Sequence, residues 1–378
     1  MADLLDQFIP SPPNSSLAPA GLQYLNLTFG VEIEFILAFI RTREWELRYE
    51  TIKAKGLGTG ETRLAELIEM DQERSTIVDS LRGASIPVND LGEVDSTRWS
   101  VESDGSVIPT EEEKEHRTPR FGNGQECLLT EEQWEKLTYC SVEVKSCVLP
   151  FNGYSLQEVE LVVQTIVKNH AVYVNWTCGL HVHVGNQNFG FPIQTLKNFA
   201  TLVTCFEQQI NEIHPRHRLT SDFCLLESTA FHPEDRSPMR MAEIIDRFET
   251  VKDVISRFGM DRNDPEVIQH NWCYNFNNLL WREDRRTIEF RQHASTLDSA
   301  AILRWIQFAC TSVAIAHKLP KEALWALVRE GTELGMEWDL SMLLCKLDQF
   351  DLAASYLFHS NQHPADMELY DSFLSPDS

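Results

Sequence analysis

Four short segments in which apolar and ionisable residues alternate constrain the fold of this chain more than any other feature. They span residues 29–35, 141–145, 180–184 and 287–291. Successive side chains of a β-strand point to opposite faces of a sheet, so each segment predicts a strand that buries its apolar face. The opposite faces carry four pairs of ionisable residues: Glu32 and Glu34, Glu143 and Lys145, His181 and His183, and Glu289 and Arg291.

If these strands share one sheet, its polar face gathers four carboxylates, two imidazoles and two cations. Ionised carboxylates that lie close together raise one another's pKa, so such a face needs a counter-charge. Carboxylate oxygens suit magnesium or manganese, and an imidazole favours manganese. Metals held in this way commonly bridge phosphate oxygens during phosphoryl transfer. The residues alone leave a structural alternative open, in which Glu289 and Arg291 form a cross-strand network with Glu143 and Lys145.

Helical periodicity marks the segments between and after these strands. The predicted helices cover residues 61–81, 155–170, 193–213 and 299–317, and two or three more lie between residues 321 and 358. Ser155 and Glu158 have the spacing of a capping box at a helix start. The apolar stripes on these helices indicate packing in a core. An aromatic cluster favours core packing over stacking on an adenine ring: Trp272, Tyr274, Phe276 and Trp281.

The overall charge and the two ends of the chain narrow the range of partners. The sequence has 378 residues with 33 basic and 57 acidic side chains, a net charge of −24. A surface this acidic repels phosphate backbones and disfavours nucleic acid, and it is compatible with metal ions and amine substrates. Residues 1–24 predict a flexible arm, residues 111–126 a surface loop and residues 363–378 an acidic tail. We expect no signal peptide and no membrane-spanning segment, and hence no membrane partner.

The nine cysteines are scattered singly along the chain, without a C-x-x-C pair. An odd number at irregular spacing argues against a disulfide framework and against a structural zinc site. A reducing compartment is therefore favoured, and we expect a cytoplasmic protein.

Taken together, six segments resemble the fungal amidoligase family of the glutamine-synthetase-like carboxylate–amine ligases. The resemblance extends from about Phe29 to Phe308. The segments are FGVEIEF at residues 29–35, WSVESDGSV at 99–107, EVKSCVLP at 143–150, TCGLHVHVG at 177–185, HPRHRLTSDFC at 214–224 and RTIEFRQHASTLD at 286–298.

The resemblance implies a fold and an activity. The fold would be an α+β, glutamine-synthetase-like catalytic domain over residues 25–320, followed by a C-terminal helical extension over residues 321–362. Its sheet would be curved and mainly antiparallel, with helices packed on the apolar face. The activity would be ATP-dependent ligation of a small-molecule carboxylate to an amine through an acyl phosphate, with Mg²⁺ or Mn²⁺. Amino acids and peptide-like molecules form one candidate class of substrate.

The resemblance also implies roles for single residues. The metal ligands would be Glu32, Glu34, Glu143, His181 and Glu289. The catalytic residues would be Arg291, Glu289 and His183. The nucleotide-binding residues would be His183, Lys145, Arg218 and Arg291. The residues alone fit Arg218 equally well as a surface charge and Lys145 equally well as the partner of a neighbouring Glu. Asp104-Gly105 is first of all a hairpin turn signal.

Two departures from the family pattern bear on the amine acceptor. Ser146 is followed by Cys147 rather than proline, and the proline comes at Pro150. The sequence also has Ser221-Asp222 where the family has an asparagine. Two other function classes remain open: a metal-dependent hydrolase of amide bonds, and a catalytically inactive relative that binds a ligand. In metal-dependent hydrolases a His-x-His pair usually ends an early strand. In this sequence an early strand carries Glu-x-Glu instead, so the hydrolase is less favoured.

Overall fold

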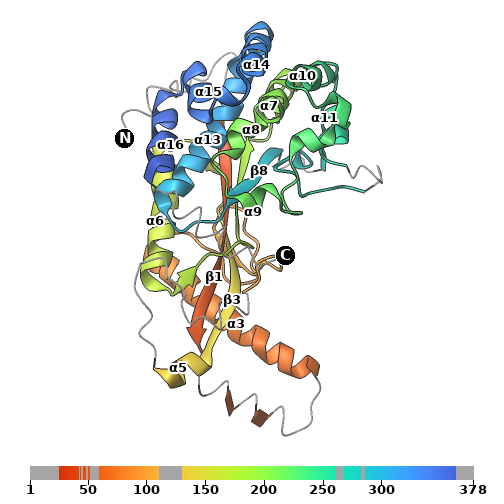
Figure 1. The fold of residues 1–378 in the computed structure, drawn as a ribbon. Helices are drawn as coiled ribbons and strands as arrows, with labels where there is room; N and C mark the ends of the chain where they lie inside the picture. Colours follow the sequence, from red (N-terminus) through yellow and green to blue (C-terminus); the bar gives the residue numbers. More distant parts are fainter. Residues whose placement is uncertain are drawn as a thin grey trace.

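A mainly antiparallel sheet of eight strands organises the described part of the chain (Figure 1). The structure is a computed structural model, and it describes residues 25–41, 59–109, 130–260, 267–281 and 286–362, together with five residues between 43 and 51. The predicted arm at residues 1–24, the loop at 111–126 and the tail at 363–378 lie outside the described residues. The fold combines this sheet with α-helices, which agrees with the predicted mixture of helices and antiparallel strands.

The order of the strands brings the four predicted segments together. The path runs β2-β3-β1-β6-β8-β7, and β4 and β5 pair with β1. The strands are β1 (Thr28–Ile40), β2 (Ser100–Glu102), β3 (Leu137–Lys145), β4 (Leu149–Pro150), β5 (Val172–Tyr173), β6 (Gly179–Gly185), β7 (Tyr274–Asn275) and β8 (Thr287–Ala294). Thus β3, β1, β6 and β8, which carry the four ionisable pairs, are neighbours, and the prediction of one shared sheet is confirmed.

Strand β1 is longer than the predicted segment at residues 29–35. Its first half alternates as expected, with the side chains of Val31, Ile33 and Phe35 fully buried. Its second half, ILAFI, has apolar residues at every position. Ile36 and Ala38 face a second small apolar cluster that also contains Tyr139, so both faces of the strand are covered there. A strand buried on both faces has no polar alternation, and this is why its extent was missed.

Helices cover the apolar face of the sheet. The helix α13 (Ser299–Lys318) contacts β1 and β6, and it packs against α6 (Gly153–Asn169) and α7 (Ile193–Cys205). The helix α3 (Thr59–Gly83) packs against α6. Figure 1 shows β1 and β3 side by side through the middle of the molecule, with α7 and α13–α16 gathered at one end. The predicted helices at 61–81, 155–170 and 299–317 are therefore confirmed within a few residues.

The helix predicted over residues 193–213 is interrupted. It divides into α7 and α8 (Glu207–Asn211) at Phe206, whose backbone leaves the helical region at φ −112° and ψ 22°. The ring of Phe206 is buried and packs edge-on against Trp338, with ring centroids 5.5 Å apart. Apolar periodicity continues across the break, because both halves pack on the same core.

The region after residue 320 forms several helices, as predicted. They are α14 (Lys321–Leu334), the 3-10 turn η3 (Gly335–Glu337), α15 (Leu340–Lys346) and α16 (Phe350–Gln362). Gly335 ends α14 with φ +56°, a conformation that favours glycine. Leu324, Leu343 and Leu352 belong to the same apolar core as the sheet. The proposed domain boundary at residue 320 stays a prediction.

The remaining helices are short and lie mostly between β6 and β8 in the sequence. They are α5 (Glu131–Lys136), α9 (Arg216–Leu219), η1 (Glu227–Ala230), η2 (Pro233–Asp235), α10 (Pro238–Asp246), α11 (Val251–Phe258) and α12 (Asn278–Trp281). Three members of the aromatic cluster, Trp272, Tyr274 and Phe276, are fully buried in this region. They belong to the core, as expected.

One described helix bears on the expectation that no segment crosses a membrane, and that expectation stays a prediction. Helix α13 is 20 residues long and apolar enough, by length and composition alone, to cross a membrane. Its residues Trp305, Ile306 and Ala309 are completely buried against the rest of the chain. A buried core helix passes the same test of length and hydropathy, and the packing of α13 is of this kind.

Candidate functional site

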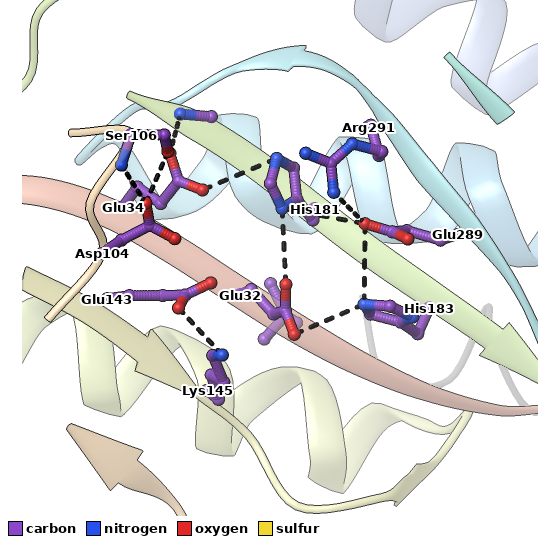
Figure 2. Close-up of polar contacts among 12 residues, drawn as sticks. Glu32, Glu34, Asp104, Ser106, Glu143, Lys145, His181, His183, Glu289 and Arg291 are labelled. Atoms are coloured by element: carbon purple, nitrogen blue, oxygen red, sulfur yellow. Dashed lines mark hydrogen bonds and ion pairs between the residues drawn. The ribbon is translucent and has the colours of Figure 1, made fainter. Parts of the chain in front are cut away.

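The ionisable pairs meet on one face because the strand registers bring them opposite one another. Across β1 and β3, Glu34 faces Glu143 and Glu32 faces Lys145. Across β1 and β6, Glu32 faces His181. Across β6 and β8, His183 faces Glu289. Figure 2 shows the side chains of these residues pointing toward one another on one side of the sheet.

At the centre of this polar face, two carboxylates share two imidazoles. Glu32 Oε2 lies 3.3 Å from His181 Nδ1, and Glu32 Oε1 lies 3.4 Å from His183 Nε2. Glu289 Oε1 lies 3.9 Å from His181 Nδ1 and 4.0 Å from His183 Nε2. Charge on the imidazoles can therefore be balanced from both neighbouring strands (Figure 2).

Arg291 lies at the edge of this network, beside Glu289. Its Nη1 is 2.5 Å from Glu289 Oε1, and its side chain is 22% exposed. The Nε atom is buried and has no hydrogen-bond partner among the residues that the structure describes. The negative charge of Glu289 raises the pKa of Arg291 in spite of burial. The guanidinium is thus a fixed cation with a donor still available.

A bulge in β8 determines where Arg291 lies. Between the pairs Leu180–His293 and Val182–Phe290, two steps along β6 correspond to three steps along β8, so the extra residue falls at Arg291 or Gln292. The buried side chain of Arg218 supports this bulge. Its Nη2 donates to the carbonyl oxygen of Arg291 at 2.6 Å, and its Nε donates to that of Gln292 at 3.3 Å. Arg218 therefore positions β8, and a direct phosphate contact by it stays a prediction.

A second group of carboxylates occupies the other end of the face. Donor atoms of Glu34, Asp104 and Glu143 all lie within 4.8 Å of one another. Glu34 Oε2 accepts the backbone N–H of Gly179 at 2.6 Å, and its Oε1 lies 3.7 Å from His181 Nε2. The face therefore continues without interruption from Arg291 to Asp104.

Asp104 is a member of this group that sequence reasoning missed. The Asp104-Gly105 pair was interpreted as a turn signal, and Asp104 Oδ1 does accept hydrogen bonds from the backbone N–H and the hydroxyl of Ser106, at 2.6 and 2.5 Å. The short strand β2 pairs with β3 just before this turn, with Glu102 opposite Glu143. That pairing carries Asp104 to the polar face. A strand of three residues has too little alternation to be recognised in the sequence.

Lys145 pairs with carboxylates on two strands. Its Nζ lies 2.9 Å from Glu143 Oε2 and 3.2 Å from Glu102 Oε2. These carboxylates raise the pKa of Lys145 in spite of burial. The alternative of one network joining Glu143 and Lys145 to Glu289 and Arg291 does not hold, because β1 and β6 separate the two pairs. A phosphate contact by Lys145 stays a prediction.

Burial and neighbouring charges give the ionisable groups at the two ends of the face different pKa shifts. Burial, reinforced by the charge of Glu32, raises the pKa of Glu143 to about 8, and burial also raises the pKa of Glu34. Burial alone would also raise the pKa of Glu32 and Glu289. His183 and other nearby positive groups instead hold the pKa of both carboxyl groups below its usual range. Glu32 and Glu289 in turn raise the pKa of His183 to about 8, against its burial. The carboxylates at the Glu143 end thus lack a full counter-charge.

The residues present fit divalent cations. Among the residues that the structure describes, three groups have donor atoms close enough to share an ion: Glu32, Glu143 and His181; Glu32, His183 and Glu289; and Glu34, Asp104 and Glu143. Two of the groups combine carboxylate oxygens with one imidazole and the third has carboxylate oxygens only, and such donors match the preferences of Mg²⁺ and Mn²⁺. Each of the five predicted metal ligands belongs to one of these groups.

Comparison with known proteins places the chain in a family. No curated protein matches the chain. The sequence model of the amidoligase enzyme family matches residues 25–313. This range contains every strand of the sheet and every residue of the polar face. The chain therefore belongs to the amidoligase enzyme family.

Proposed function

We propose that this protein is an ATP-dependent ligase that joins a small-molecule carboxylate to an amine through an acyl phosphate. One observation carries the proposal. Carboxylates and imidazoles from four adjacent strands converge on one face of the sheet, and a fixed guanidinium lies at its edge. This combination suits phosphoryl transfer, because metal ions held by the carboxylates and imidazoles, together with the guanidinium, would neutralise charge on the phosphate oxygens.

Two cation-binding groups follow from which donor atoms lie close together. Glu32, His183 and Glu289 would hold one divalent cation beside Arg291. Glu34, Asp104 and Glu143 would hold another at the far end of the face, and His181 lies between the two ends. Bound Mg²⁺ or Mn²⁺ would supply positive charge to the phosphate oxygens of ATP.

The chain's own cations act on the group that is transferred. The guanidinium of Arg291 can donate two hydrogen bonds in one plane, which suits a phosphoryl group with developing negative charge. Glu289 fixes the direction of Arg291 through the contact at 2.5 Å. Arg218 holds the backbone under it, so the guanidinium needs little rearrangement when the nucleotide binds. His183 and Lys145 are the further candidates for phosphate contacts.

The amine would approach from the carboxylate-rich end of the face. An ammonium substrate is attracted by ionised carboxylates, and it must lose a proton before it attacks the acyl group. We propose amino acids or peptide-like molecules as the substrate class, a glutamine-synthetase-like fold for the domain, and a cytoplasmic location. The net charge of −24 supports a cationic or amine substrate rather than a nucleic acid.

The test is ADP release measured across a panel of amino acids and amines, with Mg²⁺ and separately with Mn²⁺. The expected result is ADP formed only when a carboxylate and an amine are both present, together with an amide product identified by mass. Glu289→Gln should abolish this release. The control is Glu330→Gln, which removes a carboxylate from an exposed ion pair with Lys346. Amide hydrolysis without nucleotide, lost in Glu289→Gln, would instead establish a hydrolase.

A further inference from the structure

Two buried cysteines lie in contact beneath the strand that carries Arg291. The Sγ atoms of Cys224 and Cys273 are 3.1 Å apart, and the two residues are 1% and 0% exposed. The backbone on either side aligns them. Leu225 N–H donates to the carbonyl oxygen of Asn271 at 2.7 Å, and Cys273 N–H donates to that of Leu225 at 2.9 Å. The thiols therefore face each other across two hydrogen-bonded segments.

This pair is joined directly to the polar face. The carbonyl oxygen of Cys273 accepts the backbone N–H of Arg291 at 2.8 Å. Two residues further on, Asn275 Nδ2 donates to Glu289 Oε2 at 2.9 Å. A change in the position of Cys273 is thus transmitted to both the guanidinium-bearing residue and the carboxylate that orients it.

The two thiols differ in their local electrostatic environment. A hydrogen bond from the Cys273 thiol lowers the pKa of Cys224 against its burial, and the positive charges of Arg218 and Arg291 act in the same direction. Burial and the neighbouring Cys224 raise the pKa of Cys273. A thiol with a nearby guanidinium reacts more readily with oxidants, because the thiolate is the nucleophile. Cys224 is accordingly the reactive member and Cys273 the resolving one.

We propose that Cys224 and Cys273 form a reversible disulfide that ties the segment around residue 273 to the loop around residue 224 and so controls the placement of Arg291. The oxidant is hydrogen peroxide. The Cys224 thiolate attacks one peroxide oxygen, the O–O bond breaks, and the leaving oxygen takes a proton to give water. Cys273 sulfur then attacks the Cys224 sulfenic acid, the S–O bond breaks, and a second water leaves with the thiol proton. Two thiols are oxidised, and one peroxide is reduced to two waters.

This site agrees with the pattern of single cysteines in the sequence. Thiols are the default state in a reducing compartment, and disulfides found there are usually transient and serve sensing or catalysis. The pair is not a structural framework, because the fold already holds both segments by backbone hydrogen bonds. Formation of the S–S bond must shorten the sulfur separation by about 1 Å relative to the observed contact, given a bond length near 2 Å. That shift falls on the two segments, and the segment of Cys273 is hydrogen-bonded directly to β8 at Arg291.

The first experiment treats the full-length protein with increasing hydrogen peroxide, then alkylates it in denaturant and maps the peptides by mass. The expected result is a peptide pair joined through Cys224 and Cys273 that dithiothreitol separates. The exposed Cys345 and the buried Cys310 provide internal references for oxidation of unpaired thiols. Recovery of Cys224 and Cys273 as separately alkylated thiols, under conditions that oxidise Cys345, would overturn the proposal.

The second experiment tests the connection to Arg291 without relying on enzyme activity or metal binding. Amide hydrogen exchange is compared between oxidised and reduced protein. The expected result is slower exchange at the amide of Arg291 and around Cys273 after oxidation, with no change in α14. Cys224→Ser should remove this difference, whereas Cys310→Ser should keep it. Identical exchange at Arg291 in both redox states, with the disulfide present, would show that the cross-link does not act on the site.

Discussion

The two oxygens of Glu289 make different kinds of contact at the end of the polar face that carries Arg291. Oε2 accepts a hydrogen bond from Asn275 at 2.9 Å, which fixes the carboxylate from behind. Oε1 lies 2.5 Å from the guanidinium of Arg291 and about equally far from both imidazoles. A carboxylate oriented by a second side chain can place its other oxygen reproducibly, and metal sites depend on such support.

The first prediction concerns Arg291→Lys. We expect it to lower turnover by about two to three orders of magnitude, because an ammonium cannot donate two hydrogen bonds in a fixed plane. The measurement is steady-state ADP release by protein whose thermal unfolding matches the unchanged chain. Arg240→Lys, at an exposed ion pair with Asp235 and Glu243, is the matched control and should keep full turnover. Equal turnover in Arg291→Lys would show that Arg291 only stabilises the strand.

The second prediction concerns the pH dependence of stability. The pKa values of Glu143 and His183 are both raised to about 8 in the folded protein. Between pH 6.5 and 8 the folded chain therefore holds protons that the unfolded chain has released, and stability must fall as pH rises through this window. Buried His293, whose pKa is lowered to about 4, acts in the opposite sense, but only below pH 6.5.

Urea unfolding in the presence of a chelator, at a series of pH values from 6.5 to 8.5, measures this effect. We expect the unfolding midpoint to decrease across the series. Glu143→Gln should flatten the decrease, because a neutral amide has no proton to lose. A profile that is level or rising in the unchanged protein would contradict the pKa shifts of both groups.

At the scale of strands and helices, local periodicity was enough to predict most of the architecture. The segments around Glu32, Glu143, His181 and Glu289 were identified because each alternates over five or more residues. The length of β1 beyond Phe35 and the break at Phe206 were missed, since burial on both sides removes the contrast on which periodicity depends. No sequence pattern marks the bulge in β8, which follows from pairing between distant strands.

The strand residues of the candidate site could be predicted from the sequence, but the residues that position them could not. Asp104 reaches the polar face only because a strand of three residues pairs with β3. Arg218, whose predicted phosphate contact stays a prediction, supports the bulge by donating to two carbonyl oxygens, and nothing in the sequence indicated this role. Asn275 lies on a strand of two residues and gave no signal at all. Each of these roles depends on contacts between residues far apart in the sequence, which one sequence does not reveal.

The third prediction concerns Asn275 as a positioning residue. Asn275→Ala should weaken Mn²⁺ binding by about tenfold, because loss of a partner behind a metal ligand commonly has an effect of this size. Isothermal calorimetry on protein with unchanged urea unfolding measures it. Asn169→Ala removes a comparable amide hydrogen bond within α6, to Thr165, and should leave Mn²⁺ affinity unchanged. Equal affinity in Asn275→Ala would mean that Glu289 needs no support.

At the scale of the whole molecule, the two faces of the sheet have different roles. Its apolar face packs against α13, which in turn packs on α6 and α7, and these elements share the main core. Its polar face gathers acidic groups in a protein that already carries a net charge of −24. Such a protein repels ATP in the absence of cations, because both partners are strongly negative. Divalent cations bound at the polar face would make the interaction with ATP attractive there, and only there.

The fourth prediction follows from this balance of charge, and it tests the central claim that the polar face binds nucleotide through divalent cations. Calorimetric titration of ATP should show binding with Mg²⁺ or Mn²⁺ and at least a tenfold loss of affinity in excess chelator, since each lost tenfold corresponds to about 1.4 kcal/mol of interaction. Glu32→Gln should reproduce that loss with metal present, and Glu330→Gln should not. Equally tight ATP binding in chelator and in Mg²⁺ would contradict the claim.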